Sequence, residues 1–528
     1  MVILHGQLKV LCSYSLRDDS EFETLKNQQQ QQYNNWLTMA GKSKKKKSLN
    51  FSNISDTDSS TSSEEEEKKK KKRRKRRVVV KRGNDRTNPN QTGKPTKSSV
   101  LDIEDFSDEL TVLKIRASLL DWYDANQRVL PWRKKRGSSI QPDEEDERQT
   151  FKRAYAVWVS EIMLQQTKVA TVIDYYNRWM DKWPSLQHLA QATQEEVNEM
   201  WAGLGYYRRA RFLLEGAKMV IEGGEEFPRT VPQLLKVRGI GDYTAGAIAS
   251  IAFNESVPVV DGNVVRVIAR LKAISANPKE SETIKSFWKL AGQLVDPFRP
   301  GDLNQALMEL GATICTPTSP SCSSCPISEQ CHAFSLSKNS QSVQVIDYPL
   351  KVIKPKPRRE FSAVCVVEIL DDQKGTCSNM SSRLLLVKRP EEGLLAGLWE
   401  FPSVLFDGEG DLGTRRKVMD QYLKKSFELD TRNCNVISRE EVGDCIHIFS
   451  HIRLRMYVEL LVINLNGEEK ILSEKEGNDT VAWKCISSNA IEGMGLTSGV
   501  RKVYNMIQQY KQKTSLVYSR KKKNTQTK

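Results

Sequence analysis

The chain has 528 residues, of which 38% are hydrophobic, and it carries a formal net charge of +15. That length allows two or three domains, and the low hydrophobic fraction predicts that part of the chain does not form a core. No stretch approaches the roughly 20 apolar residues of a membrane-spanning helix, so we expect no membrane association. Ten cysteines without an export signal argue against a disulfide framework and for reduced thiols or a metal site.

The positive charge is concentrated in two segments. Residues 41–100 hold 20 Lys/Arg against 7 Asp/Glu, and residues 501–528 hold 9 Lys/Arg and no acidic residue. The first segment contains the unbroken basic run Lys68–Arg77, which is typical of a nuclear import signal or of a loose tether to phosphate. We expect nuclear localisation, with an additional organelle pool left open. Because residues 101–500 contain more acidic than basic residues, total charge cannot establish nucleic-acid binding.

The first part of the chain differs in pattern from the rest. Residues 1–105 lack sustained apolar periodicity and are predicted to be a disordered basic region. Helical spacing begins at Leu110–Asn126, and the acidic insert Gln141–Glu147 is predicted to be a surface loop. From Ala154 onward, helical segments of about 10 to 20 residues are separated by Gly or Pro. Residues 106–335 are therefore predicted to be an all-α domain.

A second domain begins after a change of pattern. Residues 336–360 are rich in Ser, Lys and Pro and are predicted to be an interdomain linker. An α+β domain is predicted over residues 361–512, with a basic tail at 513–528. Its predicted elements are three strands, Phe361–Leu370, Arg383–Val387 and Leu454–Ile463, and one helix, Arg416–Phe427.

Four cysteines lie close together after the last helical segment. Cys315, Cys322, Cys325 and Cys331 have the spacing C-x6-C-x2-C-x5-C. Four such thiolates can ligate a zinc ion or a 4Fe–4S cluster, and unligated buried thiols are the ordinary alternative. Structural zinc sites usually pair two short C-x2-4-C segments, and only one is present here. The spacing resembles the cluster loop of the endonuclease III and MutY glycosylases, and this resemblance implies a 4Fe–4S cluster.

A glycine-containing turn precedes a helix of small residues. Gly239 and Gly241 allow positive φ and leave the backbone bare, so amide N–H groups can approach a phosphate at the start of Thr244–Ser250. Alone, such a pair is more often a plain turn. Val259–Val264, with Asp261 inside it, comes about 20 residues later. Together the two segments resemble the helix–hairpin–helix and Gly/Pro-Asp signature of base-excision glycosylases.

Two carboxylates are candidates for catalysis. Breaking an N-glycosidic bond builds positive charge on the sugar, which a carboxylate such as Asp261 can stabilise. A second group must protonate the departing base. Glu161 is flanked by apolar residues that would raise its pKa, although a solvent-facing helical glutamate is the ordinary alternative. The string Ser-Glu-Ile-Met-Leu-Gln-Gln-Thr, residues 160–167, resembles the MutY motif that carries the adenine-protonating glutamate.

Tyr243 indicates the subtype of glycosylase. Bifunctional relatives carry a lysine at this place in the hairpin, where it forms a Schiff base, and a phenol cannot form that imine. The resemblance therefore implies a monofunctional enzyme that leaves an abasic site. It also implies that Tyr243 helps to organise the catalytic pocket and that Asn263 lies close by.

Several residues are candidates for contact with DNA. Tyr206, in Gly-Leu-Gly-Tyr-Tyr, matches the residue that intercalates in the MutY family, although a core tyrosine is the ordinary alternative. Gln165 and Gln166 are expected to form hydrogen bonds with base edges. Arg208 and Arg209 are expected to contact phosphates or to be ordinary surface residues.

The second domain has its own resemblance. Leu394–Pro402, after the predicted strand Arg383–Val387, resembles the start of a Nudix (MutT-like) fold. A hydrolytic Nudix helix would need an Arg-Glu pair and two adjacent glutamates to bind magnesium, and Arg415–Lys425 lacks them. We therefore expect this domain to bind a ligand and not to hydrolyse one.

The segment His447–His451 suggests that ligand. Phe449, Ser450 and His451 resemble the Phe-Ser-His loop with which the MutY C-terminal domain probes 8-oxoguanine, although a plain turn at a strand end is the ordinary alternative. The resemblance implies that the phenylalanine wedges into the base stack. The serine and histidine would form hydrogen bonds with the altered edge of the lesion.

The resemblance to the MutY family implies a monomer that excises adenine from duplex DNA with adenine:8-oxoguanine or adenine:guanine mispairs. It also implies that repair proteins or a replication clamp dock on the linker. Val265 replaces a lysine of some bacterial members, which puts one phosphate contact in doubt. Tyr243 and the C-terminal domain argue against an endonuclease III-like lyase. Retention of Glu161 and Asp261 argues against a catalytically silent adaptor, and the missing glutamates argue against a Nudix hydrolase.

Overall fold

The computed structural model describes residues 103–525 except 107, 134–146, 225, 354, 371–381, 466–481 and 489. The basic run Lys68–Arg77 and the acidic insert around Glu144 lie outside the described residues, so their roles stay predictions. Within the described ranges, no helix is both long enough and apolar enough to span a membrane.

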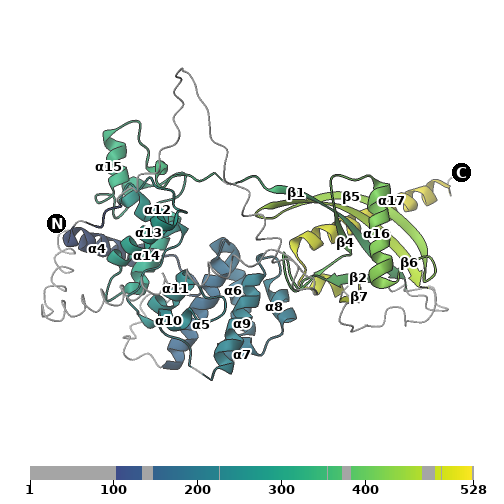
Figure 1. Cartoon of the computed structure of the whole chain (residues 1–528), viewed down its shortest axis with the longest axis horizontal. Coiled ribbons are helices and arrows are strands. Elements are labelled where there is room, and N and C mark those ends of the chain that lie inside the picture. Colours follow the sequence, from purple (N-terminus) through teal and green to yellow (C-terminus); the bar gives the residue numbers. More distant parts are fainter. Residues whose placement is uncertain are drawn as a thin grey trace, which may run out of the picture.

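Figure 1 shows a helical domain and an α+β domain beside each other, joined by the chain between α15 and β1. This arrangement confirms the predicted all-α domain followed by an α+β domain. The helical domain contains α4 (Glu109–Asn126), α5 (Glu147–Leu164), α6 (Val169–Lys182), α7 (Leu186–Ala190), α8 (Gln194–Trp201), α9 (Arg208–Glu222), α10 (Val231–Leu234), α11 (Asp242–Phe253), α12 (Gly262–Leu271), α13 (Ser281–Leu294), α14 (Pro300–Thr313) and α15 (His332–Asn339).

The helical domain contains two apolar cores. One forms around α5 and α11, where Trp158 is nearly fully buried, and the other forms around α4, α12 and α14. Helix α11 is buried along most of its length because its residues are small and apolar, which lets α5 pack closely against it. Val260 and Met308 pack against both cores. The region around these two side chains is therefore the junction of the domain's two halves.

The second domain is a twisted mixed sheet between two helices. The strand order is β3-β2-β1-β6-β5, with β4 paired to β1 and β7 paired to β2, and β1 runs parallel to β6. Helix α16 buries Met419 and Leu423 against one face, and α17 buries Val503 and Ile507 against the other. The elements are β1 (Arg358–Leu370), β2 (Ser382–Lys388), β3 (Trp399–Glu400), β4 (Ser403–Phe406), α16 (Leu412–Phe427), β5 (Cys434–Ile448), β6 (Ile452–Leu465), β7 (Trp483–Ser487) and α17 (Ser498–Thr525).

The structure differs from the sequence prediction at two elements of this domain. Strand β5 was not predicted, because its polar and apolar residues are mixed and only Cys434 is buried, so that pairing with β6 makes it a strand. The predicted basic tail is, up to Thr525, the continuation of α17. No glycine or proline interrupts residues 500–525, and Lys, Arg and Gln are good helix formers, so nothing in the sequence ends the helix earlier.

The two domains contact each other at several places in the second domain, one of which is the segment predicted to start the Nudix fold. Leu398 is 2% exposed and packs into the core around α5 and α11. Arg211 on α9 donates a hydrogen bond from Nη1 to the Glu391 carbonyl oxygen at 3.1 Å. Gly495 lies so close to α8 that an added Cβ would be 2.6 Å from Glu199 Cα. Leu398, Glu391 and Gly495 therefore all belong to the contact with the helical domain.

Candidate active site

Glu161 is buried inside the helical domain. It lies in the last turn of α5, facing α11, and only 6% of its surface is exposed. Burial raises the pKa of Glu161 to about 7, because the charged form loses its hydration. The negative charge of Asp261 raises this pKa further, whereas a hydrogen bond from Tyr243 and the charge of Arg133 lower it. Glu161 is therefore not a solvent-facing glutamate, and near neutral pH it can hold a proton.

Tyr243 is the direct partner of Glu161. Its hydroxyl donates a hydrogen bond to Glu161 Oε2 at 2.5 Å and lies 3.5 Å from Met308 Sδ. Burial raises the pKa of Tyr243 well above 10, so the phenol keeps its proton and remains a donor at neutral pH. The tyrosine is in the first turn of α11, which places the hairpin predicted from its glycines directly against the buried acid.

Asp261 is held as the N-cap of α12. Its Oδ1 accepts hydrogen bonds from the backbone N–H groups of Asn263 at 2.9 Å and Val264 at 2.7 Å. Its Oδ2 accepts from Asn263 Nδ2 at 2.7 Å. Burial raises the pKa of Asp261 above its usual range, and these three N–H groups oppose that effect by favouring the carboxylate. The predicted pair Asp261 and Asn263 is thus in direct contact.

The Asp261 network continues to the cysteine loop. Arg266, one turn along α12, donates from Nη2 to Asn263 Oδ1 at 2.7 Å and from Nε to the Cys315 carbonyl oxygen at 2.8 Å. Gly311 on α14 allows this close packing, because an added Cβ there would be 2.6 Å from Asn263 Cβ. Neither Arg266 nor Gly311 was predicted from the sequence. The spacing i, i+3 from Asn263 was the available signal for the arginine.

A second charged group missed by sequence reasoning lies near Glu161. Glu309 is 1% exposed and accepts hydrogen bonds from Arg128 Nε at 2.6 Å and Arg133 Nη2 at 2.9 Å. Arg133 is close enough to Glu161 to lower its pKa. Its Nε is buried without a hydrogen-bond partner among the described residues. Arg133 thus carries one unpartnered buried donor, and a glutamate about 180 residues away in sequence on α14 holds its guanidinium in place.

The hairpin glycines differ from each other. Gly239 has φ +86°, and an added Cβ would be 2.7 Å from Phe212 Cβ, so only glycine suits this position. Gly241 is the N-cap of α11 with an extended φ of −109°, so it does not use the positive φ that glycine allows. The space beside Gly241 is open to 4 Å. That opening leaves room for a phosphate at the helix N-terminus.

The predicted DNA-contacting residues at the end of α5 and before α9 lie in two short loops. Tyr206 is 49% exposed, which does not fit a core tyrosine, and its φ is +49°. Gln166 is exposed with φ +57°, and Gln165 is half-buried. Arg208 is exposed, but Arg209 is not, and it binds backbone carbonyl groups of both loops. The expectation of a phosphate-contacting or surface Arg209 is therefore wrong.

The four candidate ligand cysteines line one cavity of about 290 Å³. In the part of the chain that the structure describes, no three Cys, His, Asp or Glu side chains form a preformed metal site. Arg270 at the cavity is 2% exposed, and its Nη1 donates to Cys315 Sγ at 3.3 Å and to the Thr316 carbonyl oxygen at 2.7 Å. None of its contacts in the described residues is a carboxylate. Backbone carbonyl groups satisfy most of its N–H groups, and a thiolate-ligated cluster would add an anionic neighbour for the guanidinium.

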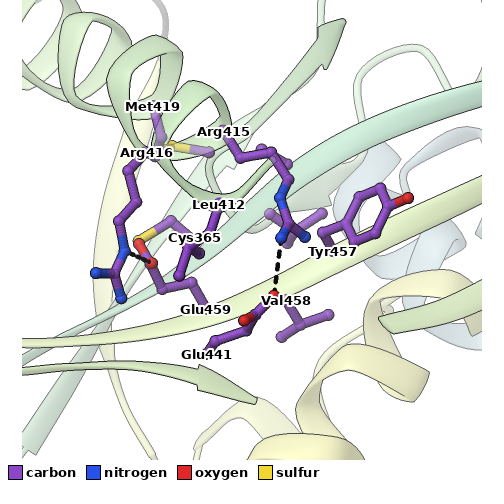
Figure 2. A pocket seen from close by; sticks show the side chains of 11 residues that line it. Cys365, Leu412, Arg415, Arg416, Met419, Glu441, Tyr457, Val458 and Glu459 are labelled. Atoms are coloured by element: carbon purple, nitrogen blue, oxygen red, sulfur yellow. Dashed lines mark hydrogen bonds and ion pairs between the residues drawn. The ribbon is translucent and has the colours of Figure 1, made fainter. Parts of the chain in front are cut away.

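A pocket of about 280 Å³ lies under α16 in the second domain, and Figure 2 shows the side chains that line it. Arg415 donates to Glu441 at 2.9 Å and stacks over the Tyr457 ring. Arg416 contacts Glu459 at 2.5 Å. Both carboxylates of the pocket are thus bound by arginines from α16.

The candidate lesion-binding residues form the tip of the β5–β6 hairpin. The Phe449 N–H donates to the Ile452 carbonyl oxygen at 2.8 Å, and Ser450 and His451 at the turn are exposed. The Arg358 N–H donates to the His451 carbonyl oxygen at 3.0 Å, which ties the tip to the start of β1. That end of the sheet faces the helical domain (Figure 1). The His447 ring packs edge-on against Phe449 with centroids 4.5 Å apart.

Comparison with known proteins decides the family. Residues 159–293 match the model of the HhH-GPD superfamily base excision DNA repair protein, and residues 376–506 match that of the NUDIX domain. The chain is 42% identical to the adenine DNA glycosylase of Homo sapiens over 450 residues, which are 78% of this chain and 77% of that protein. The chain belongs to the adenine DNA glycosylase family.

Two further similar proteins match different shares of this glycosylase chain. It is 58% identical to the adenine DNA glycosylase of Arabidopsis thaliana over 424 residues, and the match spans 76% of this chain and 65% of that protein. The solved complex between the C-terminal domain of mouse MUTYH and human PCNA covers 29% of this chain and 90% of that chain. Its sequence identity is 27% and its TM-score is 0.21.

We predict that Glu161→Gln removes most glycosylase turnover while binding to the mispair persists. An amide has the same shape but cannot donate the proton, and general acid catalysis is typically worth about 100- to 10,000-fold. Asp261→Asn should also lose turnover, because the negative charge that stabilises the sugar cation is gone. Single-turnover cleavage and gel-shift binding measure the two effects separately. Near-wild-type turnover in either variant would refute the role assigned to that residue.

We also predict a bell-shaped dependence of the single-turnover rate on pH. Glu161 must be protonated, so the rate should fall as pH rises through its pKa of about 7. Asp261 must be ionised, so the rate should also fall at acidic pH. Because the pKa of Asp261 is raised, this fall should occur at a higher pH than for an ordinary aspartate. The control is Glu161→Gln, whose residual rate should lack the alkaline limb. If that limb persists in the variant, another group causes it.

Proposed function

We propose that this chain hydrolyses the N-glycosidic bond of adenine mispaired with 8-oxoguanine or guanine, without lyase activity, and leaves an abasic site. The observation that carries this proposal is the buried carboxyl of Glu161, with a pKa near 7 and a hydrogen bond from Tyr243. Family membership gives the reaction class, and the geometry supports the assignment of roles.

The two carboxyl groups have opposite tasks in this reaction. Glu161 donates its proton to the departing adenine, which takes the electron pair of the breaking C–N bond. Positive charge then develops on the deoxyribose, and Asp261 stabilises it because its oxygens are fixed by three N–H donors. Water adds to the sugar carbon and gives its proton to the Glu161 carboxylate, which restores the starting acid. Tyr243 holds the Glu161 carboxyl in place and cannot form an imine with the sugar.

The remaining site residues suit the handling of an extruded adenine. The unpartnered Arg133 Nε can donate to an acceptor of the base, and Glu309 fixes the guanidinium that carries it. The exposed Tyr206 fills the space that adenine leaves in the stack. Two further pairs act at the DNA surface: base edges contact Gln165 and Gln166, and a phosphate contacts Gly239 and Gly241.

The direct test is incubation of the full chain with duplexes that contain adenine opposite 8-oxoguanine. The expected product is a strand that breaks at the adenine position only after alkali. Borohydride should trap no covalent enzyme–DNA adduct, because Tyr243 cannot form a Schiff base. Strand breaks without alkali, together with a trapped adduct, would contradict a monofunctional enzyme. Intact adenine under single-turnover conditions would contradict the proposed function.

We propose further that Cys315, Cys322, Cys325 and Cys331 hold a 4Fe–4S cluster. The four thiols share one cavity, and the buried Arg270 there lacks an anionic partner. When bound, the cluster supplies iron–thiolate bonds that cross-link the loop after α14. The protein purified without exposure to oxygen should be brown and contain about four iron atoms per chain. Stoichiometric zinc without iron would contradict this cofactor.

We propose that the hairpin tip at Phe449–His451 recognises 8-oxoguanine while the helical domain removes adenine. Adenine itself is undamaged, so contacts to it cannot identify a mispair, and the information must come from the opposite base. The tip has the required exposure, and the end of the sheet that carries it faces the helical domain (Figure 1). Phe449 would enter the stack, while Ser450 and His451 would contact the lesion edge.

Replacing Ser450 and His451 with Ala should therefore narrow the preference for 8-oxoguanine over guanine. Each lost hydrogen bond costs about 1 kcal/mol, so cleavage opposite 8-oxoguanine should slow about 5- to 30-fold. Cleavage opposite guanine, which lacks the altered edge, should change less. Thr414→Ala on α16 is the matched control, because its exposed hydroxyl only contacts the helix N-cap. Equal slowing on both substrates would make the tip a general DNA clamp.

We propose nuclear import through Lys68–Arg77, on the basis of the sequence alone. Deletion of residues 1–100 should abolish nuclear accumulation of a fluorescent fusion and leave cleavage in vitro unchanged. Restoring the ten-residue basic run to the truncated chain is the control. Unchanged nuclear accumulation of the truncated chain would contradict the proposal. Docking of repair proteins or a replication clamp on residues 336–360, and the monomeric state, stay predictions.

A further inference from the structure

One guanidinium joins the loop after the catalytic helix to the loop that carries Tyr206. Arg209 Nη1 lies within hydrogen-bonding distance of the carbonyl oxygens of Ile162, Met163 and Gln165, at 3.0, 2.9 and 2.5 Å. Its Nη2 lies 3.0 Å from the Gly205 carbonyl oxygen. Arg209 therefore contacts the C-terminal end of α5 on one side and the wedge loop (residues 202–207) on the other.

The environment of Arg209 shows why these contacts hold. Burial lowers the pKa of Arg209 to about 10, so the guanidinium stays charged at neutral pH but has lost much of its hydration. No carboxylate is among its contacts in the described residues, and backbone carbonyls replace water around it. Its plane also stacks on Trp201 and Tyr206, with Cζ 5.2 and 5.5 Å from the ring centroids. Loss of the Arg209 guanidinium would leave several of these backbone carbonyl groups without a hydrogen-bond donor.

Each of the two loops that Arg209 joins contains one residue in an unfavourable backbone conformation. Gln166 has φ +57° and Tyr206 has φ +49°, in the left-handed region that side chains other than glycine rarely occupy. Such conformations persist when the surrounding structure determines them. Ile162 and Met163 come directly after Glu161, and their carbonyls are among the last of α5, which the helix itself cannot satisfy. The position of the Glu161 carboxyl therefore depends on how this helix end is held.

We propose that Arg209 is a positioning residue that couples insertion of Tyr206 into the duplex to the placement of Glu161. This inference rests on the proposed function, because it assigns Tyr206 to the duplex and Glu161 to proton donation. A duplex that presses on the wedge loop moves the Gly205 carbonyl, and the shared guanidinium transmits that displacement to the end of α5. A displacement of about 1 Å at a catalytic group can cost about 100-fold in rate.

Arg209→Lys tests the coupling with little loss of packing or charge. A lysine ammonium has three donors on a flexible stem, so it can contact one loop but does not form a planar bridge between both. The matched control is Arg178→Lys on α6. Arg178 also stacks on an aromatic ring, Tyr175 at 4.6 Å, but hydrogen-bonds only within its own helix. Circular dichroism and the melting temperature establish that each variant is folded.

The measurement is a double-mutant cycle of Arg209→Lys with Tyr206→Ala on a duplex with adenine opposite 8-oxoguanine. The single-turnover rate of Arg209→Lys should fall at least about 10-fold. Its Kd for the duplex with a non-hydrolysable 2′-fluoroadenosine should change less than about threefold. In the Tyr206→Ala background, the lysine substitution should slow cleavage less than about twofold further, because the wedge is already absent.

Three results overturn the proposal and differ from one another. A wild-type rate for Arg209→Lys, with a normal Arg178→Lys control, shows that Arg209 positions nothing. A full additional loss in the Tyr206→Ala background shows that Arg209 supports α5 without coupling it to the wedge. Failure of the wild-type chain to release adenine refutes the proposed function, and the inference falls with it.

Discussion

The burial of the Glu161 carboxyl against Tyr243 is the constraint on which the site depends. An ionised carboxylate in that position would lose its hydration, so the pKa of Glu161 rises to about 7 and the acid can still hold its proton near neutral pH. Asp261 is also largely enclosed but accepts three N–H hydrogen bonds at the start of α12, which favour its charged form. Burial thus raises the pKa of both carboxyl groups, but Asp261 alone has three N–H donors that favour its charged form.

The position of this pair depends on the packing of the whole domain. Glu161 comes from the core around α5 and α11, whereas Asp261 begins the helix that packs with α4 and α14. Met308 belongs to the edge of both cores and touches the Tyr243 hydroxyl. A change in how the two halves pack would therefore change the distance between acid and anion. Arg266 connects Asn263 to the cysteine loop by hydrogen bonds. The cysteine loop therefore supports the part of the site that holds Asp261.

The sequence predicted the residues whose chemistry is carried by short local patterns. The cysteine spacing, the glycines around residue 240 and the Ser-Glu-Ile-Met string identified both fold and candidate acid. It could not predict Glu309 and Arg133, because about 180 residues separate these partners and only tertiary packing joins them. Arg209 looked like a surface arginine because nothing local shows that two loops fold around it. Strand β5 was not predicted because its own composition does not indicate a strand. It becomes one through its pairing with β6.

The central claim is that burial raises the pKa of Glu161 to about 7, so that a large share of this acid still holds its proton at neutral pH. It is tested most directly by NMR titration of protein labelled with ¹³C at glutamate carboxyl carbons, with Glu161→Gln used to assign the resonance. The account predicts a titration midpoint near the pKa of about 7. It also predicts a higher midpoint in Tyr243→Phe, because the lost hydrogen bond had favoured the carboxylate. A Glu161 resonance that titrates near 4.5, the usual value, in both proteins would contradict it.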